Sequence, residues 1–222
     1  MKLFIGNKTY SSWSLRGWLA CKQSGLPFEE AVVPLYDQDW DQRREGDEFG
    51  PSGGKVPILW DDETVVWDSL AIIEYLNEKT GNAREFWPKD IGARAMARST
   101  AAEMHSSFAA LRREHAMNTR RIFPPRQPSD AVLADLERIY TLWAEARARH
   151  GSGGPFLFGK FGAADMMYAP VCTRLITYSL PAPRFAQGYV AAVLTHPWMQ
   201  QWLAEAQEED WTIQRYEEPV VE

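Results

Sequence analysis

The segment Lys55–Leu76 constrains the fold of this chain more than any other stretch. It reads KVPILWDDETVVWDSLAIIEYL. Apolar residues at Ile58–Trp60 and Thr64–Trp67 flank a polar turn, which predicts two short strands joined as a hairpin. The pair Asp68-Ser69 then opens a stretch with apolar residues at helical spacing, which predicts a helix. The segment therefore predicts a compact unit of a hairpin followed by an amphipathic helix, with polar residues at the start of the helix.

Two features of this segment are typical of a binding site. Pro57 cannot donate a ladder hydrogen bond, so we expect it at a strand edge or in a special conformation. Asp68 and Ser69 stand at the start of a helix, where free backbone N–H groups and the helix dipole favour negative charge. The segment therefore predicts a pocket for a carboxylate. The alternative is a buried hairpin and helix with a polar cap.

With these residues, the segment resembles the glutathione half-site of cytosolic glutathione S-transferases. The resemblance implies a cis peptide bond at Pro57 and strand-like pairing of the Val56 backbone with the cysteinyl unit of glutathione. It also implies that Asp68 and Ser69 hold the γ-glutamyl end and that Lys55 reaches the glycyl carboxylate. Glutathione would then be the co-substrate.

The order of elements in the first part of the chain agrees with this resemblance. Before the hairpin we expect a strand, then a helix that starts at Ser12 and ends at Gly25, then a second strand; the strands are Lys2–Gly6 and Phe28–Val33. The charged stretch that follows has room for one short helix. This order predicts an α+β thioredoxin-like domain over residues 1–81.

After a linker at 82–90, the pattern changes to helices only, which predicts an all-α domain over residues 91–222. We expect one long helix from Ile91 to about Asn118 and another that Ser129 caps. An almost wholly apolar stretch, Asp165–Tyr178, predicts a central buried helix. Two shorter helices follow, near Arg184–Leu194 and Pro197–Gln207.

A second local motif supports the two-domain architecture. Phe156–Gly159, which reads FLFG, is followed by Ala164-Asp165 and resembles the family's "fLfG…AD" motif. The resemblance implies that Asp165 caps the buried helix and helps to nucleate folding. Gly162 stands where the family usually has a capping serine or threonine. We expect a structural role for Asp165.

The resemblance implies that catalysis stabilises the thiolate of glutathione. A free thiol has a pKa near 8.5, so a hydroxyl that donates to the sulfur beside a helix N-terminus favours the anion. The donor must lie between the first strand and the first helix.

Residues 10–16, YSSWSLR, resemble the "SSCSWR" motif of the zeta class, which includes maleylacetoacetate isomerases. The resemblance implies that Ser11 is the catalytic donor, with Ser12 as the second candidate and Tyr10 as the third. Trp13 replaces the zeta cysteine, which argues against thiol–disulfide exchange. The alternative is that the two serines only cap the helix.

The acceptor substrate should bind over the thiolate, against the first helix of the second domain. Met104, Phe108, Leu111 and Arg112 share one face of the helix expected there. The candidates to contact the acceptor are Met104, His105, Phe108 and Arg112. His105 and Arg112 could meet a carboxylate or carbonyl of the acceptor; the alternative is core packing with a polar edge. The resemblance also implies a homodimer.

Composition excludes several other classes. A net charge of −6 argues against a general binder of nucleic acid. Two distant cysteines and four histidines without ligand spacing do not predict a metal site or a disulfide framework. No apolar run approaches a membrane span, and the N-terminus reads as a strand, so we expect a cytoplasmic protein.

The leading hypothesis is therefore a detoxification enzyme that conjugates glutathione to small electrophilic, partly apolar compounds. A second hypothesis is a glutathione-dependent cis–trans isomerase of an unsaturated diacid. A third is a non-catalytic interaction module with this fold. Turnover of a dinitrobenzene acceptor would favour the first, and absent binding to immobilised glutathione would favour the third.

Overall fold

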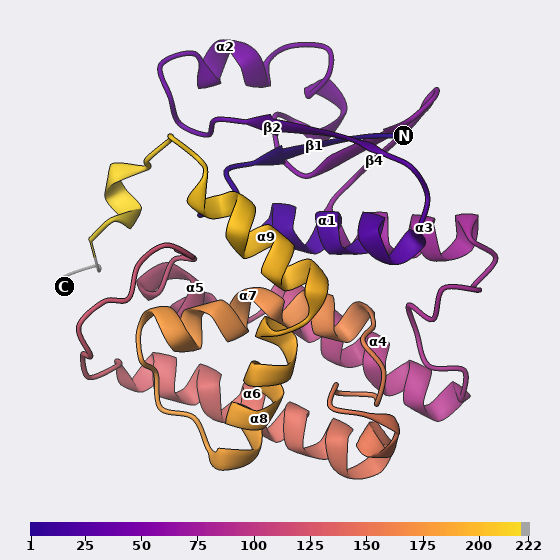
Figure 1. The fold of residues 1–222 in the computed structure, drawn as a ribbon, viewed down its shortest axis with the longest axis vertical. Coiled ribbons are helices and arrows are strands. Elements are labelled where there is room, and N and C mark those ends of the chain that lie inside the picture. Colours follow the sequence, from indigo (N-terminus) through magenta and orange to yellow (C-terminus); the bar gives the residue numbers. More distant parts are fainter. Residues whose placement is uncertain (219–222) are drawn as a thin grey trace.

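The computed structural model describes residues 1–218, and its first part is a four-stranded sheet with flanking helices (Figure 1). Its elements are, in chain order, β1 (Lys2–Gly6), α1 (Ser12–Ser24), β2 (Glu29–Val33), α2 (Trp40–Arg44), the 3-10 turn η1 (Gly50–Ser52), β3 (Ile58–Asp61), β4 (Thr64–Trp67) and α3 (Ser69–Lys79). The strands lie in the order β2-β1-β3-β4. Strand β1 is parallel to β2 and antiparallel to β3, and β3 and β4 form the predicted hairpin. The thioredoxin-like element order is confirmed.

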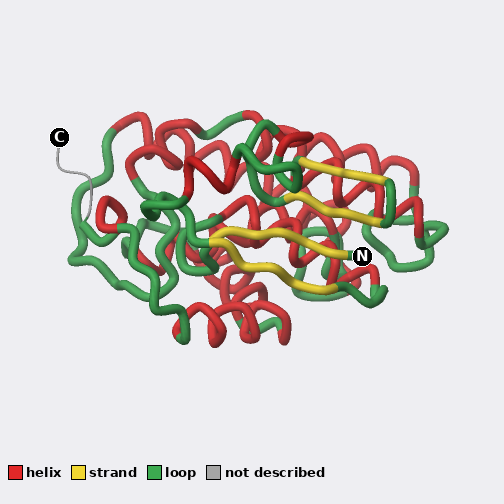
Figure 2. Tube along the Cα trace, turned by 90° about the horizontal axis from the view of Figure 1, so that it is seen from above, coloured by secondary structure: helices red, strands yellow, loops and turns green. Residues whose placement is uncertain are grey.

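The sheet separates the helices of this first part. Helices α1 and α3 lie on one face and the short α2 on the other (Figure 1). Viewed from above, the strands run side by side in one layer (Figure 2). The buried faces of β1 and β3 meet α1 and α3 through Leu3, Ile5, Leu59 and Ile72, all fully buried. This packing fixes the N-termini of α1 and α3 relative to the sheet.

The second part is helical, as predicted. It contains α4 (Ile91–Ser106), α5 (Ala109–Glu114), α6 (Asp130–His150), the 3-10 turn η2 (Gly151–Gly153), α7 (Ala163–Thr177), α8 (Arg184–Leu194), α9 (Pro197–Gln207) and the 3-10 turn η3 (Gln214–Tyr216). Helix α7 is the buried central helix. The Ser129 hydroxyl accepts from the Val132 N–H at 3.2 Å and caps α6, which confirms that start.

The single long helix predicted over 91–118 is wrong. Ser107 is extended, and Phe108 has a left-handed backbone with φ 62°, so the chain forms α4 and the short α5 instead. Bulky residues seldom adopt this conformation, so packing must hold it. The core contains Phe108 and its neighbours on both sides of the break, and the apolar spacing therefore continues across it: Met104, Phe108 and Leu111 are all buried.

Asp165 is almost fully buried and caps α7, as predicted. Its carboxylate accepts from the N–H groups of Gly162 at 2.9 Å and Leu157 at 3.1 Å, and from the Tyr189 hydroxyl at 3.0 Å. The glycine at position 162 has a steric reason, because an added Cβ would lie 2.8 Å from the carbonyl oxygen of Phe86. A serine or threonine would not fit there without a shift of that backbone.

Three contacts join the first part of the chain to the helical part around α1. The Trp18 and Trp202 rings pack edge to face with centroids 5.4 Å apart, and the Trp202 indole N–H donates to the Lys8 carbonyl at 3.0 Å. The Arg16 Nε donates to the Met167 carbonyl of α7 at 3.1 Å. Helix α1 is therefore held from below by α7 and α9. No helix among residues 1–218 has the length and apolarity to cross a bilayer.

Candidate functional site

The loop before β3 adopts the conformation that the sequence predicts. The peptide bond between Val56 and Pro57 is cis. Pro57 is buried against α1, where an added Cβ at Gly17 would lie 2.9 Å from the proline Cγ and 3.7 Å from Ile72 Cδ1 of α3. A glycine at this point lets α1, the proline loop and α3 meet closely. The ladder between β1 and β3 ends at Ile58, so Val56 lies outside it and is only half-buried.

The start of α3 combines a strained backbone with an unpaired hydroxyl. Asp68 is the N-cap and accepts from the Leu70 N–H at 2.8 Å, with a positive φ of 73° that non-glycine residues seldom adopt. Ser69 has 0% exposure, and its Oγ has no hydrogen-bond partner within residues 1–218. An unpaired buried hydroxyl costs about 1–3 kcal/mol. A carboxylate bound at this helix N-terminus would accept from it.

Lys55 and His105 border this helix start. Lys55 is exposed, its backbone N–H donates to the Ser52 hydroxyl at 2.9 Å, and within the described part of the chain its ammonium forms no ion pair. His105 of α4 lies with its Nε2 3.3 Å from Asp68 Oδ2. This contact connects the helical part to the N-terminus of α3.

At the start of α1, Ser11 is engaged as a cap and Ser12 is not. The Ser11 hydroxyl accepts from the Ser14 N–H at 3.3 Å and shares a hydrogen bond of 2.7 Å with the Ser14 hydroxyl. The Ser14 hydroxyl also accepts from the Gly6 N–H at 2.9 Å. Ser12 is half-buried, and its hydroxyl makes no hydrogen bond to residues 1–218. Both hydroxyls lie where the sequence predicts the sulfur donor.

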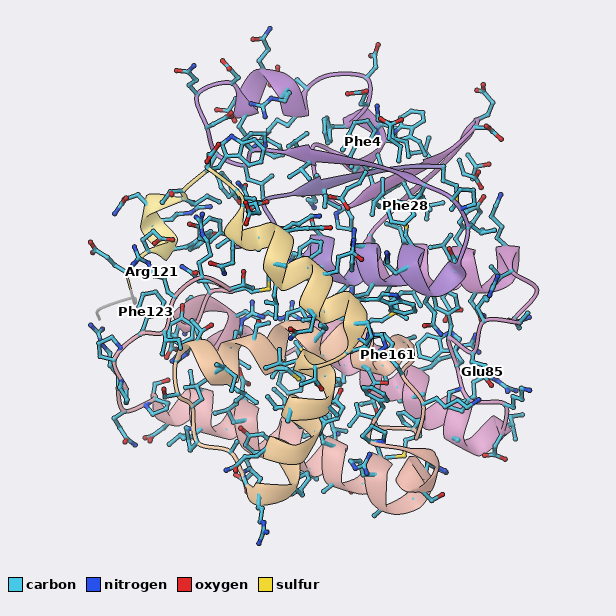
Figure 3. All side chains as sticks on the ribbon, viewed as in Figure 1. Phe4, Phe28, Glu85, Arg121, Phe123 and Phe161 are labelled. Carbon is cyan, nitrogen blue, oxygen red and sulfur yellow. The ribbon has the colours of Figure 1, made fainter. Side chains whose placement is uncertain are left out.

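Tyr10, the third candidate donor, is engaged by the C-terminal segment. Its hydroxyl donates to the Glu217 carboxylate and accepts from Arg120 Nη2 at 2.9 Å. Arg121 forms an ion pair of 2.6 Å with Glu217 and is labelled beside this segment in Figure 3. Burial, and then the hydrogen bond to Glu217, raise the pKa of Tyr10. This hydroxyl already has a donor and an acceptor in the folded chain.

The four residues predicted to meet the acceptor occupy two different environments. Met104 and Phe108 belong to the hydrophobic core. His105 packs edge to face on Trp13 with ring centroids 5.2 Å apart, and the Arg112 guanidinium lies 5.0 Å from the centre of the same indole. His105 and Arg112 are both partly exposed, so these two and Trp13 border the space over the α1 N-terminus.

Two buried arginines lie in this region, and sequence reasoning missed one of them, Arg174. Arg16 is 1% exposed and lies under the indole, with its Cζ 4.6 Å from the ring centre. Arg174, 5% exposed, projects from α7 and donates to the carbonyls of His115 at 2.7 Å and Pro170 at 3.0 Å. The available signal for Arg174 was that it is the one basic residue in an otherwise mostly apolar buried helix.

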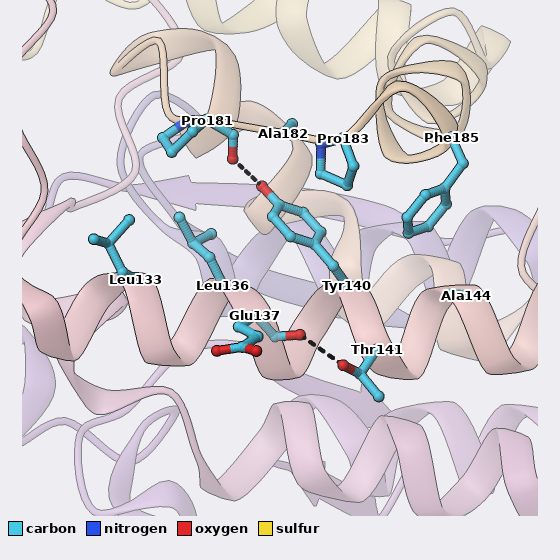
Figure 4. Close-up of a pocket in the computed structure, with 10 residues that line it drawn as sticks. All are labelled: Leu133, Leu136, Glu137, Tyr140, Thr141, Ala144, Pro181, Ala182, Pro183 and Phe185. Carbon is cyan, nitrogen blue, oxygen red and sulfur yellow. Dashed lines mark hydrogen bonds between the residues drawn. The ribbon is translucent and has the colours of Figure 1, made fainter.

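The remaining candidate features are a metal site and pockets away from the predicted site residues. Within residues 1–218, no group of three or more histidine, cysteine, aspartate or glutamate side chains is placed to hold a metal ion. An apolar groove lies between α6 and the segment before α8, where the Tyr140 hydroxyl donates to the Pro181 carbonyl at 2.7 Å (Figure 4). None of the predicted site residues lines this groove.

Comparisons with known sequences agree with the predicted family. Two family models match the chain, the glutathione S-transferase N-terminal domain over residues 10–79 and the C-terminal domain over residues 101–205. A dichloromethane dehalogenase of Methylorubrum extorquens is 39% identical over 70 residues, and one of Methylophilus leisingeri is 31% identical over 65. These matches cover 32% and 29% of this chain and 24% of each relative, so they span about a quarter of the relatives' length.

Solved structures show the same fold along nearly the whole chain. A glutathione transferase homologue from Burkholderia, crystallised with glutathione, has a TM-score of 0.67 at 24% identity and covers 94% of this chain and 98% of its own. A theta-class enzyme from Xanthomonas axonopodis pv. citri, also with glutathione bound, has a TM-score of 0.65 at 20% identity and coverages of 91% and 96%. With both family models matched in order, the chain belongs to the glutathione S-transferase family.

Proposed function

We propose that this protein binds glutathione and conjugates its thiolate to small electrophilic compounds. The observation that carries the proposal is the Ser69 hydroxyl, fully buried and unpaired within residues 1–218 at the N-terminus of α3. The cis Val56-Pro57 bond lies on the same side of α1 as helix α3, because Gly17 of α1 packs against both Pro57 and α3. Family membership and two glutathione-bound structural neighbours support the same ligand.

In the proposed pose, Ser69, Val56 and Lys55 each bind a different part of glutathione. The γ-glutamyl carboxylate would accept from Ser69 and the first N–H groups of α3, where the helix dipole favours an anion. The cysteinyl backbone would pair with Val56, which the β1–β3 ladder leaves outside. The glycyl carboxylate would meet the exposed Lys55. The sulfur would then lie toward the N-terminus of α1.

In this proposal Ser11 stabilises the thiolate. A hydrogen bond between two hydroxyls can have either as donor, because the hydrogen positions are not fixed by the heavy atoms. If Ser14 donates to Ser11, the Ser11 hydrogen is free for the sulfur, and the Gly6 N–H holds Ser14 in place at 2.9 Å. The thiolate would then attack the acceptor: a C–S bond forms, and a leaving group departs with its electron pair.

The test is glutathione binding by isothermal titration calorimetry to the wild type, Ser69→Ala and Ser106→Ala. Ser106 is an exposed serine of α4 whose hydroxyl bonds only its own helix, so it is the matched control. A hydrogen bond to a charged group contributes about 1.5–3 kcal/mol, so Ser69→Ala should raise the dissociation constant about tenfold or more. Equal affinities in the three proteins would refute this pose.

Turnover distinguishes an enzyme from a binding module. Wild-type protein that binds glutathione should also conjugate it to 1-chloro-2,4-dinitrobenzene, with release of chloride. Binding of glutathione without turnover of any chloronitrobenzene acceptor would favour the non-catalytic alternative. Light scattering during size-exclusion chromatography would test the homodimer that the family resemblance implies.

A further inference from the structure

Two arginines from distant parts of the sequence contact Trp13, and a third, Arg174, lies on the neighbouring helix α7. Arg16 comes from α1, Arg112 from α5 and Arg174 from α7. Burial lowers the pKa of Arg16 well below its usual range, the positive charges of Arg112 and Arg174 lower it further, and the Asp68 carboxylate acts in the opposite direction. The Trp13 indole contacts two of them, at 4.6 Å from Arg16 and 5.0 Å from Arg112.

These guanidinium groups have neutral partners only. Arg16 donates to the carbonyl of Met167, Arg174 to the carbonyls of α5 and α7 residues, and Arg112 to the His105 carbonyl at 3.1 Å. Among residues 1–218, no carboxylate forms an ion pair with any of the three. Carbonyls satisfy individual N–H groups but do not neutralise the charge, and buried charges in proteins are ordinarily paired.

Two nitrogens in this cluster also lack a hydrogen-bond partner. Arg16 Nη1 and Arg112 Nε are both buried and unpaired within residues 1–218. Asp135, whose negative charge raises the pKa of Arg112 against the effect of burial, accepts from the Leu111 N–H at 2.9 Å and forms no ion pair with Arg112. The cluster therefore has free donors and, in the described part of the chain, no ion pair, with Asp68 and Asp135 as the carboxylates whose charges act on Arg16 and Arg112, and Arg112 is partly exposed.

The cluster faces the acceptor side of the proposed site. Trp13 contacts His105, which in turn contacts Asp68 at the proposed γ-glutamyl position. The two carboxylates of glutathione already have partners in the proposed pose, at Ser69 and Lys55. An anion at Arg112 would therefore belong to a different molecule, bound between the α1 N-terminus and the helical part.

We propose that the acceptor is an electrophile with a carboxylate group, which Arg112 and Arg16 bind while its unsaturated or aromatic part stacks on Trp13. This inference rests on the proposed glutathione-dependent function and names its substrate class. A guanidinium matches the planar carboxylate with two parallel hydrogen bonds, and Arg174 adds positive charge from below. Trp13 is half-buried, so the exposed part of its indole would pack against the rest of the molecule.

The test compares two acceptors of similar shape and different charge, 4-chloro-3-nitrobenzoate and 4-chloro-3-nitrobenzamide, with each kcat/KM divided by the uncatalysed rate constant with glutathione, because the amide activates the ring more strongly. With either one, the thiolate forms a C–S bond at the chlorine-bearing carbon, chloride leaves with the electron pair, and the carboxylate or amide is unchanged. We expect this normalised kcat/KM of the wild type to be at least tenfold higher for the carboxylate, mainly through KM. A ratio near one would refute the inference and leave the transferase function standing.

Variants then assign the preference to the cluster. Arg112→Gln should lower the carboxylate-to-amide ratio of kcat/KM about tenfold or more. Arg113→Gln, the control on the next residue of α5, should leave the ratio within twofold, because Arg113 is exposed and pairs with Glu114. Arg112→Lys keeps the charge and should retain part of the preference if Arg112→Gln does not fold. A wild-type ratio in folded Arg112→Gln, or in Arg112→Lys where the glutamine variant does not fold, would contradict the assignment.

Binding without chemistry separates the two proposals. Calorimetry with 3-nitrobenzoate and 3-nitrobenzamide, neither of which can be substituted by the thiolate, should show binding of the carboxylate at least tenfold tighter. If glutathione does not bind and no acceptor turns over, the transferase proposal fails, and this titration still tests the arginine cluster. Equal or absent binding of the two ligands would overturn the anion site.

Discussion

Replacement of Ser11 by alanine removes one hydroxyl with two roles, one in folding and one in the proposed chemistry. As N-cap of α1, this hydroxyl accepts from the Ser14 N–H at 3.3 Å. Loss of a serine cap costs about 0.5–2 kcal/mol of folding stability. For a chain of this size each kilocalorie lowers the thermal midpoint by about 2–4 °C, so Ser11→Ala should melt a few degrees lower.

The second role sets the ionisation of bound glutathione. Removal of a hydrogen bond to a thiolate should cost about 1–3 kcal/mol, which corresponds to about one to two pKa units of the bound thiol. The pKa rises, so at neutral pH the thiolate fraction and the turnover should fall about tenfold or more. The rate should recover as the pH rises through the new pKa. Glutathione affinity should change little, because Ser69 and Lys55 hold its carboxylates in the proposed pose.

The assay is the ultraviolet absorbance of the bound thiolate as a function of pH, with a thermal melt of each protein. Ser12→Ala is the matched comparison, because Ser12 lies next in the chain and its hydroxyl makes no hydrogen bond within residues 1–218. Its melting point should stay within about 2 °C of the wild type. If Ser11→Ala lowers only the melting point and Ser12→Ala shifts the titration, Ser12 is the donor. If neither shifts the titration, the zeta-like interpretation of this segment is wrong.

Two further predictions concern the start of α7 and its surroundings. Burial raises the pKa of Asp165 to about 6, so its contribution to folding is fully present below about pH 4 and is lost as the pH rises through 6. In urea melts, the free energy of unfolding of the wild type relative to Asp165→Asn should therefore fall by about 3 kcal/mol between pH 4 and pH 8; a constant difference would contradict this. Gly162→Ala should destabilise by about 1–3 kcal/mol, because its Cβ would lie 2.8 Å from the Phe86 carbonyl oxygen. Gly188→Ala in α8, where nothing lies within 4 Å of an added Cβ, should stabilise by about 0.5–1 kcal/mol, and equal effects of the two substitutions would count against the steric argument.

The sequence by itself determined the features that depend on neighbouring residues. The starts of α6 and α8, the end of α1 at Gly25 and the β3–β4 hairpin follow from caps, turn residues and apolar period, which act within a few residues. The cis proline and the acid–serine helix start were predicted because one short segment carries both. The helix cap at Asp165 was likewise expected, from the resemblance of its own motif to the family's.

Only the tertiary structure decided where distant residues meet. The break at Phe108 has no local signal, because the apolar spacing is the same for one helix or for two that share a core. Whether Ser11 or Ser12 has a free hydroxyl depends on Ser14 and on the strand above it. The arginines at positions 16, 112 and 174 lie far apart in sequence, and the packing of α1, α5 and α7 brings Arg16 and Arg112 to Trp13 with Arg174 on the adjoining helix. Periodicity reports which residues are buried, but not which buried charges share a neighbour, because that depends on the long-range contacts that close the core.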